Sequence, residues 1–415
     1  MRYRFAMKEF FEVSDLQDVF EYIREFPEVE SEDVALADAP GRVLAEDVVA
    51  GEDLPEFSRS VMDGYAVRAA STFGASEASP AFLTVMGSVA MGETPAFSVG
   101  MGEAARISTG GMLPEGAECV IMVEHTERLD DTTIEAYKSI APGQNIIARG
   151  EDFAKGQTIL SRGQQLKPPE TGLLAAFGRT TARVFKQPVV GILSTGDEIV
   201  PVDRKPPPGT VRDINTYTLL ALVKEAGGIP VAYGIVRDHY ADLFASCRRA
   251  VEECDMTLIS GGSSVGVRDF TIDVLSALPE SEILVHGISI SPGKPTILAK
   301  AGHGAVWGLP GHVASAMVVF QIVVRPFIHR VAGRSRTNAF GQTRPAVLTR
   351  NINSAQGRVD YVRVRLFEEA GVRKAEPILG KSALINTMVR ADGLVAVGLN
   401  TEGLDKDAAV EVIPL

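Results

Sequence analysis

The chain has 415 residues, a length that predicts about two to four domains. Hydrophobic residues make up 45% of the chain and charged residues 23%, which is typical of a globular protein with a sizeable core. The formal net charge of −12 argues against an extended nucleic-acid surface and against binding to anionic membranes.

The N-terminal part of the chain predicts one helix followed by β structure. Ser14 and Gln17 have the spacing of a capping box, and apolar residues then recur at helical spacing, which predicts a helix over about residues 14–26. From 34 to 116, short apolar runs broken by Gly, Pro and Ser predict an all-β region. Glycines interrupt the residues 131–165 in the same way.

After residue 187 the pattern alternates between strands and helices. The apolar run 189–193 predicts a buried parallel strand, and Asn215 is placed to cap a helix that runs to about Glu225. Further strands are predicted near 229–236, 256–259, 283–290, 296–299 and 304–308, and further helices near 240–253, after 269 and over 313–330. This alternation predicts a three-layer α/β domain with a mostly parallel sheet, whose strand C-termini lie on one edge.

The last part of the chain returns to β structure. The polar stretch 333–338 is interpreted as a linker, and short strands are predicted at 346–348, 360–367, 393–397 and 409–413. These strands predict a small C-terminal β domain.

The chain contains no pattern of a secreted or membrane-spanning protein. The apolar segment 313–328 is interrupted by polar residues and falls short of the roughly 20 residues of a membrane span, so a buried helix is expected. Cys119, Cys247 and Cys254 are too scattered for a disulfide framework, and the first residues lack the apolar region of a signal peptide. A reducing cytoplasm is the expected compartment.

The predicted strand 256–259 runs into a turn of small residues. Glycine backbone and hydroxyl groups in such a turn suit a phosphate, especially where a helix begins next; the residues are Ser260, Gly261, Gly262, Ser263 and Ser264. Asp269 follows and is placed to hold a divalent cation against that phosphate. The alternative is an ordinary strand-to-helix turn.

Three acids follow successive predicted strands of the sheet. Glu198 comes after Ser194, Thr195 and Gly196 at the end of the first strand; Asp238 and Asp269 follow the next two strands. Because the C-termini of parallel strands share one edge, these acids are predicted to share a crevice, where clustered carboxylates favour Mg²⁺. Taken singly, each is more often an acid that stabilises a turn or faces solvent than a functional one.

Other turns combine small residues with charged or hydroxyl groups. Asp63 lies in a turn, Thr109 lies beside two glycines, and Arg149 precedes Asp152. Lys294 in a proline-rich turn and the turn of Pro310 that opens a helix are candidate anion sites, although Lys294 is equally a surface lysine. The six histidines are too dispersed to predict a zinc site.

Together these motifs resemble the series found in molybdopterin molybdenumtransferases, the MoeA family, which includes the E domain of gephyrin. The matching segments, in chain order, are Ser60-Val-Met-Asp-Gly-Tyr-Ala-Val67, Thr109-Gly110, Gly150-Glu-Asp152, Ser194-Thr-Gly-Asp-Glu198, Ser260-Gly-Gly-Ser-Ser-Val-Gly266, Pro292-Gly-Lys-Pro295 and Gly308-Leu-Pro-Gly311. The resemblance extends from about residue 10 to 330 and, less distinctively, through the C-terminal β domain.

The resemblance implies a multidomain α/β plus β chain. An N-terminal helix (1–30) would pack with the α/β domain, followed by a connecting domain I (31–50 and 150–187), a β-rich domain II (51–149), an α/β molybdopterin-binding domain III (188–333) and a β domain IV (334–415). It also implies an elongated homodimer whose active site lies between domain III of one subunit and domain II of the other.

The implied reaction takes adenylylated molybdopterin and molybdate, or tungstate, releases AMP and leaves the metal on the pterin dithiolene. The acids and hydroxyl implied to be catalytic are Asp63, Thr109, Asp152, Glu198, Asp238 and Asp269, and Glu198, Asp238 and Asp269 would hold Mg²⁺. The residues implied to bind the cofactor are Ser194, Thr195, Gly196, Ser260, Gly261, Gly262, Ser263, Ser264, Lys294 and Pro310. Implied partners are molybdopterin adenylyltransferase and proteins that mature molybdoenzymes.

The chain departs from the family pattern near its predicted anion sites. Ser291 stands where many relatives carry lysine, and His312-Val313 stands where they read Asn-Pro. Loss of a positive charge beside the oxyanion affects its binding more than the fold. The alternatives to a molybdate insertase are therefore a tungstate-specific paralogue, an enzyme of an upstream adenylylation or hydrolysis step, and a non-catalytic molybdopterin-binding scaffold.

Overall fold

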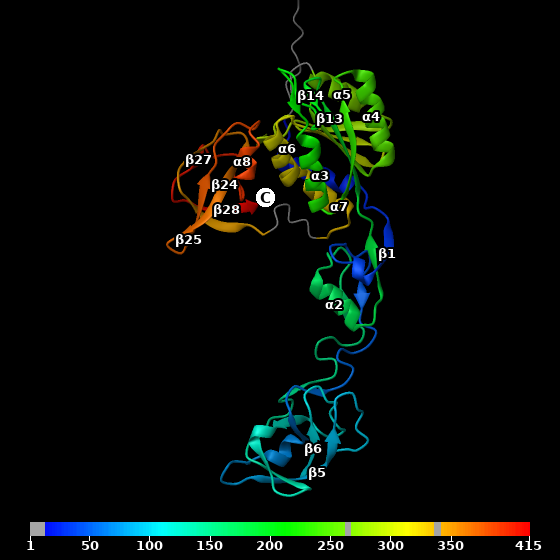
Figure 1. Cartoon of the computed structure of the whole chain (residues 1–415), viewed down its shortest axis with the longest axis vertical. Coiled ribbons are helices and arrows are strands. Elements are labelled where there is room, and N and C mark those ends of the chain that lie inside the picture. Colours follow the sequence, from blue (N-terminus) through cyan, green and yellow to red (C-terminus); the bar gives the residue numbers. More distant parts are fainter. Residues whose placement is uncertain (1–12, 262–266, 336–341) are drawn as a thin grey trace, which may run out of the picture. The chain divides into compact units, whose positions relative to one another are not determined.

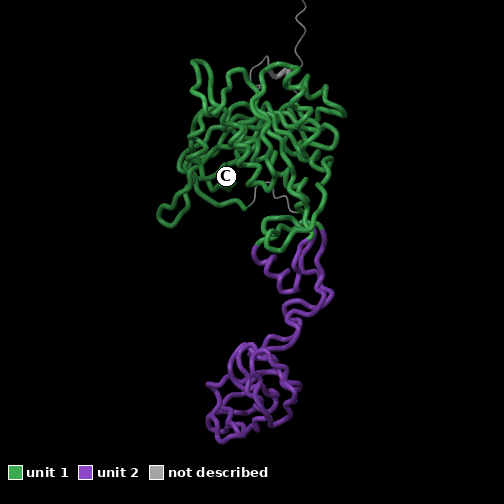
Figure 2. The backbone as a smooth tube through the Cα atoms, turned by 45° about the vertical axis from the view of Figure 1, so that its right-hand side comes forward, with its two compact units in different colours: residues 1–45, 163–167, 183–415 green, residues 46–162, 168–182 purple. Residues whose placement is uncertain are grey.

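The computed structural model of the chain (Figure 1) describes residues 13–261, 267–335 and 342–415. The chain separates into two compact units, coloured in Figure 2. Unit 1 comprises residues 1–45, 163–167 and 183–415, and unit 2 comprises residues 46–162 and 168–182. The chain thus passes from unit 1 into unit 2 and back twice. The finer five-segment division stays a prediction.

Unit 1 contains a six-stranded α/β sheet in the order β16-β13-β17-β21-β20-β18. Its strands are β13 (Val189–Thr195), β16 (Ile229–Val236), β17 (Met256–Gly261), β18 (Ser281–His286), β20 (Ile297–Ala301) and β21 (Gly304–Leu309). The first four strands of the order are parallel, so their C-termini lie on one edge, as predicted. β20 runs antiparallel to both of its neighbours, which makes the sheet mixed. A two-residue connection between β20 and β21 forces this hairpin, because a parallel pair needs a long crossover.

Helices pack on this sheet through two separate apolar clusters. The helices are α3 (Asn215–Glu225), α4 (Tyr240–Glu253) and α5 (Val267–Ala277). Ile192 packs with α3 in one cluster, and the next residue, Leu193, packs with α4 and α5 in the other. Successive side chains of a strand point to opposite faces, so α3 covers one face of β13 and α4 the other. This explains why β13 is apolar throughout rather than alternating.

The long apolar helix is buried in unit 1. It runs through α6 (Val313–Val319), a π-helical turn (Phe320–Val324) and α7 (Arg325–Val331). The segment Val313–Val331 is long and apolar enough to cross a membrane, but 83% of it is buried inside the fold, as expected for a core helix. Phe327 packs edge-on against Trp307 of β21, with ring centroids 4.9 Å apart.

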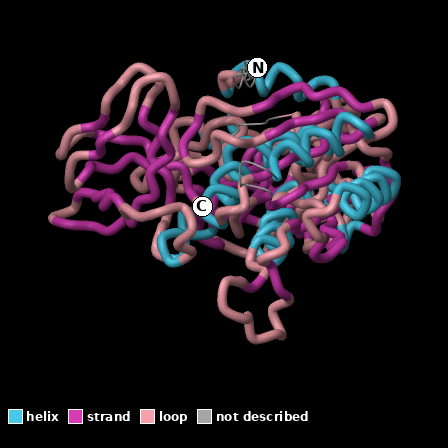
Figure 3. The backbone as a smooth tube through the Cα atoms, turned by 90° about the horizontal axis from the view of Figure 1, so that it is seen from above, coloured by secondary structure: helices cyan, strands magenta, loops and turns pink. Residues whose placement is uncertain are grey.

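A second six-stranded sheet of unit 1 contains the C-terminal strands, in the order β19-β24-β25-β22-β28-β26. The strands are β19 (Ile290–Ser291), β22 (Arg344–Leu348), β24 (Val359–Glu369), β25 (Val372–Pro377), β26 (Gly393–Val397) and β28 (Ala409–Pro414). Figure 3 shows this strand-rich part beside the helices of the α/β sheet. Four of its strands match the predicted ones. β25 and the short helix α8 (Asn386–Val389) were not predicted.

Unit 2 contains a sheet in the order β7-β4-β6-β5-β9-β8, which agrees with the predicted β character. The strands are β4 (Gly64–Val67), β5 (Ala81–Val89), β6 (Glu103–Ile107), β7 (Cys119–Met122), β8 (Thr126–Arg128) and β9 (Thr133–Ala136). Helix α2 (Pro168–Ala176) was not predicted. β4 lies between β6 and β7 in antiparallel register, which places the turn before β4 beside the turn after β6.

Short strand pairs and helices complete the architecture. The paired strands are β1 (Ser31–Ala35) with β12 (Thr181–Phe185), β2 (Val48–Val49) with β11 (Thr158–Leu160), β3 (Arg59–Ser60) with β10 (Ile146–Ile147), β14 (Ile199–Val200) with β15 (Val211–Arg212), and β23 (Ile352–Asn353) with β27 (Gly403–Leu404). The 3₁₀ turns are Tyr22–Glu25, Leu36–Asp38, Ala69–Thr72 and Val123–His125.

Two capping predictions are wrong. The first helix exists but is shorter than predicted: α1 (Leu16–Glu21) gives way to a 3₁₀ turn, and Asp15 occupies its N-cap without a side-chain capping bond. Ser14 instead forms a backbone bridge to Ile288, and Asp15 accepts a hydrogen bond from Ser289. Asn215 is the first helical residue of α3 rather than its cap. In both cases tertiary hydrogen bonds replace the local capping bond.

Candidate functional site

The end of β13 carries a buried hydrogen-bond network. Ser194 Oγ donates to Asp213 Oδ1 at 3.0 Å, and Asp213 Oδ1 also accepts from the Thr216 N–H at 3.1 Å. The hydroxyl oxygens of Ser194 and Thr216 lie 2.9 Å apart. Because the single hydroxyl proton of Ser194 is already donated to Asp213, Thr216 is the donor in this second bond. Ser194 was predicted to belong to the site; Asp213 and Thr216 were not. The network fixes the start of α3 against the end of β13.

Asn215 joins the ends of two further strands. Its Nδ2 donates to Ser260 Oγ at 2.6 Å and to the Gly311 carbonyl at 2.9 Å. The residue is only 8% exposed, and its Oδ1 has no hydrogen-bond partner among the described residues. Buried polar atoms are rarely left unpaired, so this oxygen marks an unfulfilled acceptor at the carboxyl edge of the sheet. The sequence pointed to Asn215 only as a helix cap, not as a residue of the site.

Acidic side chains lie at the same edge. Thr195 Oγ1 donates to Asp238 Oδ1 at 2.7 Å, and the Asp238 N–H donates to Asp197 Oδ1 at 3.3 Å. The structure therefore joins the ends of β13 and β16 through Asp238, while Glu198 is exposed in the turn after β13. Asp269 belongs by its backbone to the first turn of α5, but its side chain lies outside the described residues. Within the described ranges no three His, Cys, Asp or Glu residues are grouped as metal ligands.

The strand end at Gly261 admits only glycine. Its φ is +137°, and a Cβ on this residue would lie 1.9 Å from the Thr195 carbonyl oxygen of β13. Ser260, just before it, is fully buried. Gly262, Ser263 and Ser264, which were predicted to bind phosphate, lie outside the described residues. The neighbouring strand β13 thus excludes a Cβ at this position, which lets the ends of β13 and β17 lie close together.

The predicted anion turns lie against α6. Gly293 packs on α6, because a Cβ there would lie 2.5 Å from Val319 Cγ2, and the neighbouring Lys294 is exposed. Pro310 is buried just before α6. His312 Nδ1 lies 2.9 Å from Ser382 Oγ, and the Ala314 N–H donates to the Ser382 carbonyl at 3.1 Å. A loop of the C-terminal sheet therefore covers the start of α6.

A buried arginine supports that loop. Arg363 of β24 donates to the Gly380 carbonyl and to Thr387 Oγ1, each at 2.9 Å. Burial lowers the pKa of Arg363 below its ordinary value. Neither Arg363 nor Ser382 was predicted to take part in the site. The sequence held no clear signal for Arg363, because in the alternating run 362–366 it stands with Arg365 on the polar face, opposite Val364 of the core.

Unit 2 brings two of the predicted site residues together. Asp63 precedes β4 and Thr109 follows β6, and both the N–H and the hydroxyl of Thr109 donate to Asp63 Oδ1, at 2.7 and 3.0 Å. Ser60 and the glycine turn fasten the same two segments, since the Gly110 N–H donates to the Ser60 carbonyl at 2.8 Å. The Thr109 bonds, helped by Arg106, hold the pKa of Asp63 below its ordinary value. Asp63 is thus an exposed carboxylate kept ionised.

Thr109→Val is expected to raise the pKa of Asp63 part of the way to its ordinary value, because one of two donors to the ionised form is lost. A group with a lowered folded-state pKa stabilises the fold above its unfolded-state pKa, and this contribution is lost as pH falls through the folded-state pKa. The titration of ¹³C-labelled aspartate carboxyls by NMR measures the change. Asp130 gives an internal reference, because Thr132 donates to it in the same way. An unchanged Asp63 titration would contradict the assignment of its bonds.

Arg149 and Asp152 lie in another exposed turn of unit 2. Arg149 Nε pairs with Asp53 Oδ2 at 2.7 Å, and the Lys155 N–H donates to the other oxygen of that carboxyl at 2.8 Å. These two bonds lower the pKa of Asp53. Asp152 is exposed, and its N–H donates to the Leu54 carbonyl at 3.1 Å. Arg149 is thus committed to a carboxylate.

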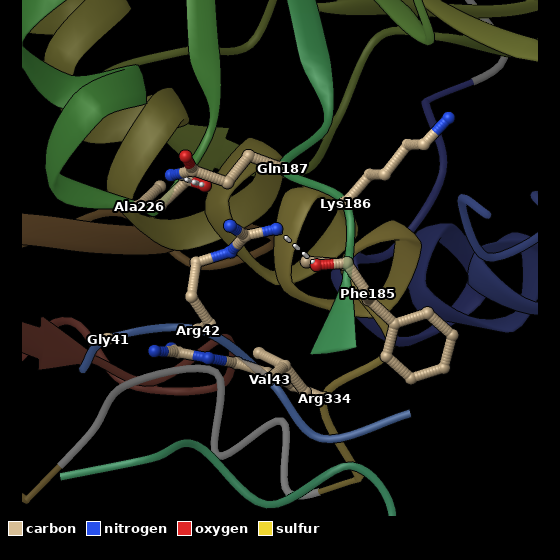
Figure 4. Close-up of a pocket in the computed structure, with 10 residues that line it drawn as sticks. Gly41, Arg42, Val43, Phe185, Lys186, Gln187, Ala226 and Arg334 are labelled. Atoms are coloured by element: carbon tan, nitrogen blue, oxygen red, sulfur yellow. Dashed lines mark hydrogen bonds between the residues drawn. The ribbon is translucent and has the colours of Figure 1, made fainter. Parts of the chain in front are cut away.

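A separate pocket of unit 1 contains no predicted site residue (Figure 4). Its lining includes Arg42, Lys186 and Ala226, from segments at the amino ends of β13 and β16. Arg42 donates to the Phe185 carbonyl at 2.8 Å and pairs with Glu32, and Lys186 pairs with Glu30. Arg42 and Lys186 are matched by acids, and Arg334, which also lines the pocket, lies 2.9 Å from His329 Nε2, so we interpret the pocket as structural.

Comparison with protein families gives three consecutive matches. Residues 13–178 match the MoeA N-terminal region (domain I and II), residues 191–330 match a probable molybdopterin binding domain, and residues 345–415 match the MoeA C-terminal region (domain IV). These matches span nearly the whole chain and include every site segment described above.

Individual proteins match over similar lengths. A molybdopterin molybdenumtransferase of Bacillus subtilis is 32% identical, with 92% of this chain and 90% of that protein covered. One from Haemophilus influenzae is 35% identical, with 81% of each covered. A crystal structure of a molybdopterin biosynthesis MoeA protein from Pyrococcus horikoshii is 38% identical, covers 97% of this chain and 99% of its own, and superposes with a TM-score of 0.79.

Proposed function

The chain belongs to the MoeA family of molybdopterin molybdenumtransferases and acts in molybdenum cofactor biosynthesis, and from this premise we propose that it inserts molybdate into adenylylated molybdopterin with release of AMP. The observation that carries the proposal is the carboxyl edge of β13 and β17. There hydroxyl groups, the strand-end glycine Gly261 and the carboxylates of Glu198 and Asp238 lie at the edge where the parallel strands of the sheet end. Such edges are where α/β sheets bind ligands.

The residues of this edge suit a diphosphate. Gly261 lets the ends of β13 and β17 approach closely where the proposed phosphate turn begins, and Asn215 and Ser194 hold the surrounding segments in place. Carboxylates at such a site need a cation, and Glu198, Asp238 and Asp269 supply the hard oxygen ligands that Mg²⁺ prefers. When bound, Mg²⁺ would offset the negative charge of the diphosphate as its P–O bond breaks. The protein's task is then to position phosphate, oxyanion and dithiolene.

Asp63 and Thr109 complete the proposed catalytic set from unit 2. An exposed carboxylate that is held ionised can accept a proton or a hydrogen bond, or ligate a cation. Asp152 belongs to the same proposal. We also propose the homodimer expected from the family, in which unit 2 of one subunit meets the α/β sheet of the other. Because neither unit contains all the proposed acids, a site shared between two subunits would bring all of them to one substrate.

The remaining expectations belong to the same proposal. They are a three-layer arrangement of residues 188–333, a cytoplasmic location consistent with three cysteines that form no disulfide, and exchange of substrate and product with molybdopterin adenylyltransferase and with maturation proteins.

The test is AMP release from adenylylated molybdopterin by the full chain, with molybdate or tungstate as the only oxyanion. We expect AMP by chromatography and, in the molybdate arm, molybdenum bound to the recovered pterin by mass spectrometry. Metal incorporation from tungstate alone would identify the tungstate paralogue. No AMP in either arm, with the pterin bound intact, would identify a scaffold.

A further inference from the structure

Met91 is an exposed apolar side chain that packs on the turn after Thr109, the residue that binds Asp63 in unit 2. It is 71% exposed, yet it lies on Gly110: a Cβ on that glycine would be 3.1 Å from Met91 Cε and 4.0 Å from its Sδ. Gly110 directly follows Thr109, the partner of Asp63. The thioether therefore lies on the turn whose Thr109 binds an ionised carboxylate, while most of its surface faces outward.

The groups around Met91 offer three different chemistries. Asp63 Oδ1 accepts both bonds from Thr109, and no partner of Oδ2 is found within residues 13–261, 267–335 and 342–415, so this oxygen remains an open acceptor. Arg106 of β6 stands opposite Tyr65 of β4 in the strand register, and Tyr65 is two residues after Asp63. The Arg106 side chain is exposed. No carboxylate in the described ranges lies within ion-pair distance of its guanidinium. Met91 lies on Gly110, the residue after Thr109, and Arg106 acts electrostatically on Asp63. A soft apolar surface, an acceptor and a cation are thus gathered around the Asp63–Thr109 pair, and we take them as one patch.

Such a patch fits a flat heteroaromatic ring that carries an amino group and an attached phosphate. Methionine sulfur makes favourable contacts with aromatic rings, and its flexible side chain adapts to the ring's position. A carboxylate oxygen accepts from an exocyclic amino group, and a guanidinium binds phosphate oxygens. Adenylylated molybdopterin contains two rings of this kind, the pterin and the adenine.

We propose that Met91, Asp63 and Arg106 form a subsite for an aminated heteroaromatic ring of the substrate, with the Met91 thioether against the ring face. The assignment rests on the proposed function for the identity of the substrate. Met91 is on this basis a specificity-determining residue, because it selects for a flat polarizable ring rather than for charge. Gly110 is needed for the subsite, because a side chain at this position would displace the thioether.

The test is equilibrium binding of AMP and of unsubstituted pterin to the full chain, measured in separate titrations by calorimetry. Met91→Ala is expected to weaken binding of at least one ring by about 2- to 10-fold, the range expected for a sulfur–aromatic contact. Met91→Leu keeps a similar volume and is expected to retain more of the affinity. The matched control is Met101→Ala, since Met101 is a 59% exposed methionine of the same unit whose Sδ lies 3.8 Å from Ser71 Oγ. Met101→Ala is expected to bind both rings like the parent chain.

The outcomes separate the possible occupants. A loss confined to AMP assigns the adenine to Met91, and a loss confined to pterin assigns the pterin; either supports the subsite. Unchanged affinity for both rings overturns it. Unchanged ring affinity together with weaker self-association in sedimentation would show that Met91 contacts a second copy of the chain, which also overturns it. Failure of the parent chain to release AMP would refute the proposed function, while the ring titrations would still decide the subsite.

Discussion

Asp63→Asn is expected to lower kcat/KM for AMP release by about a hundredfold or more, the lower end of the effect of a positioned proton-transfer group. The substitution keeps the shape of the side chain and its place between β4 and the Thr109 turn. It removes the negative charge that the Thr109 N–H and hydroxyl stabilise. Steady-state AMP release measures the effect, and an unchanged thermal midpoint would show that the fold is retained.

The chain provides a close control for this substitution. Asp130 lies in the same unit, is exposed, and accepts bonds from the N–H and hydroxyl of Thr132 at 2.7 and 3.0 Å, the same lengths as for Asp63. Its pKa is lowered in the same way. Asp130→Asn is expected to leave AMP release unchanged, because no other site residue lies in its turn. Equal losses in the two variants would mean that charge in unit 2, rather than the position of Asp63, is what matters.

Gly261→Ala is expected to destabilise the α/β sheet by about 3 kcal/mol or more. Two effects add: the φ of +137° disfavours a Cβ, and the added carbon would lie 1.9 Å from the Thr195 carbonyl oxygen. Relief requires β13 and β17 to separate at their C-termini, where the proposed phosphate turn begins. AMP release should therefore fall together with stability.

Urea unfolding followed by tryptophan fluorescence measures this change. Trp307, the single tryptophan of the chain, is buried on β21 beside Leu258 of β17 and reports on this sheet. The matched control is Gly234→Ala on the neighbouring β16, where φ is +84° but no atom lies within 4 Å of the new carbon. That variant is expected to lose only the cost of a left-handed alanine, about 1–2 kcal/mol. Coinciding unfolding midpoints for the two variants would refute the close contact at Gly261.

Local patterns predicted much of unit 1. The bounds of β16 and α4 match the predicted ranges, and the apolar run at β13 correctly indicated a buried strand. Prediction failed where a hydrogen-bond partner is distant in sequence. Asn215 has the chemistry of a helix cap, but its side chain bonds Ser260 and Gly311 instead. The antiparallel direction of β20 was also missed, because an apolar strand has the same pattern in either direction.

The sequence by itself determined which residue types stand at the strand ends, the alternation of the α/β part and the family to which the chain belongs. These follow from neighbouring residues, because periodicity, glycine turns and motif spacing are local properties. Only the tertiary structure decided that Thr109 holds Asp63 ionised, that Arg363 supports the loop over α6, and that Met91 lies on Gly110. Those contacts depend on strand register and on the packing of segments far apart in the chain, and no local pattern encodes them.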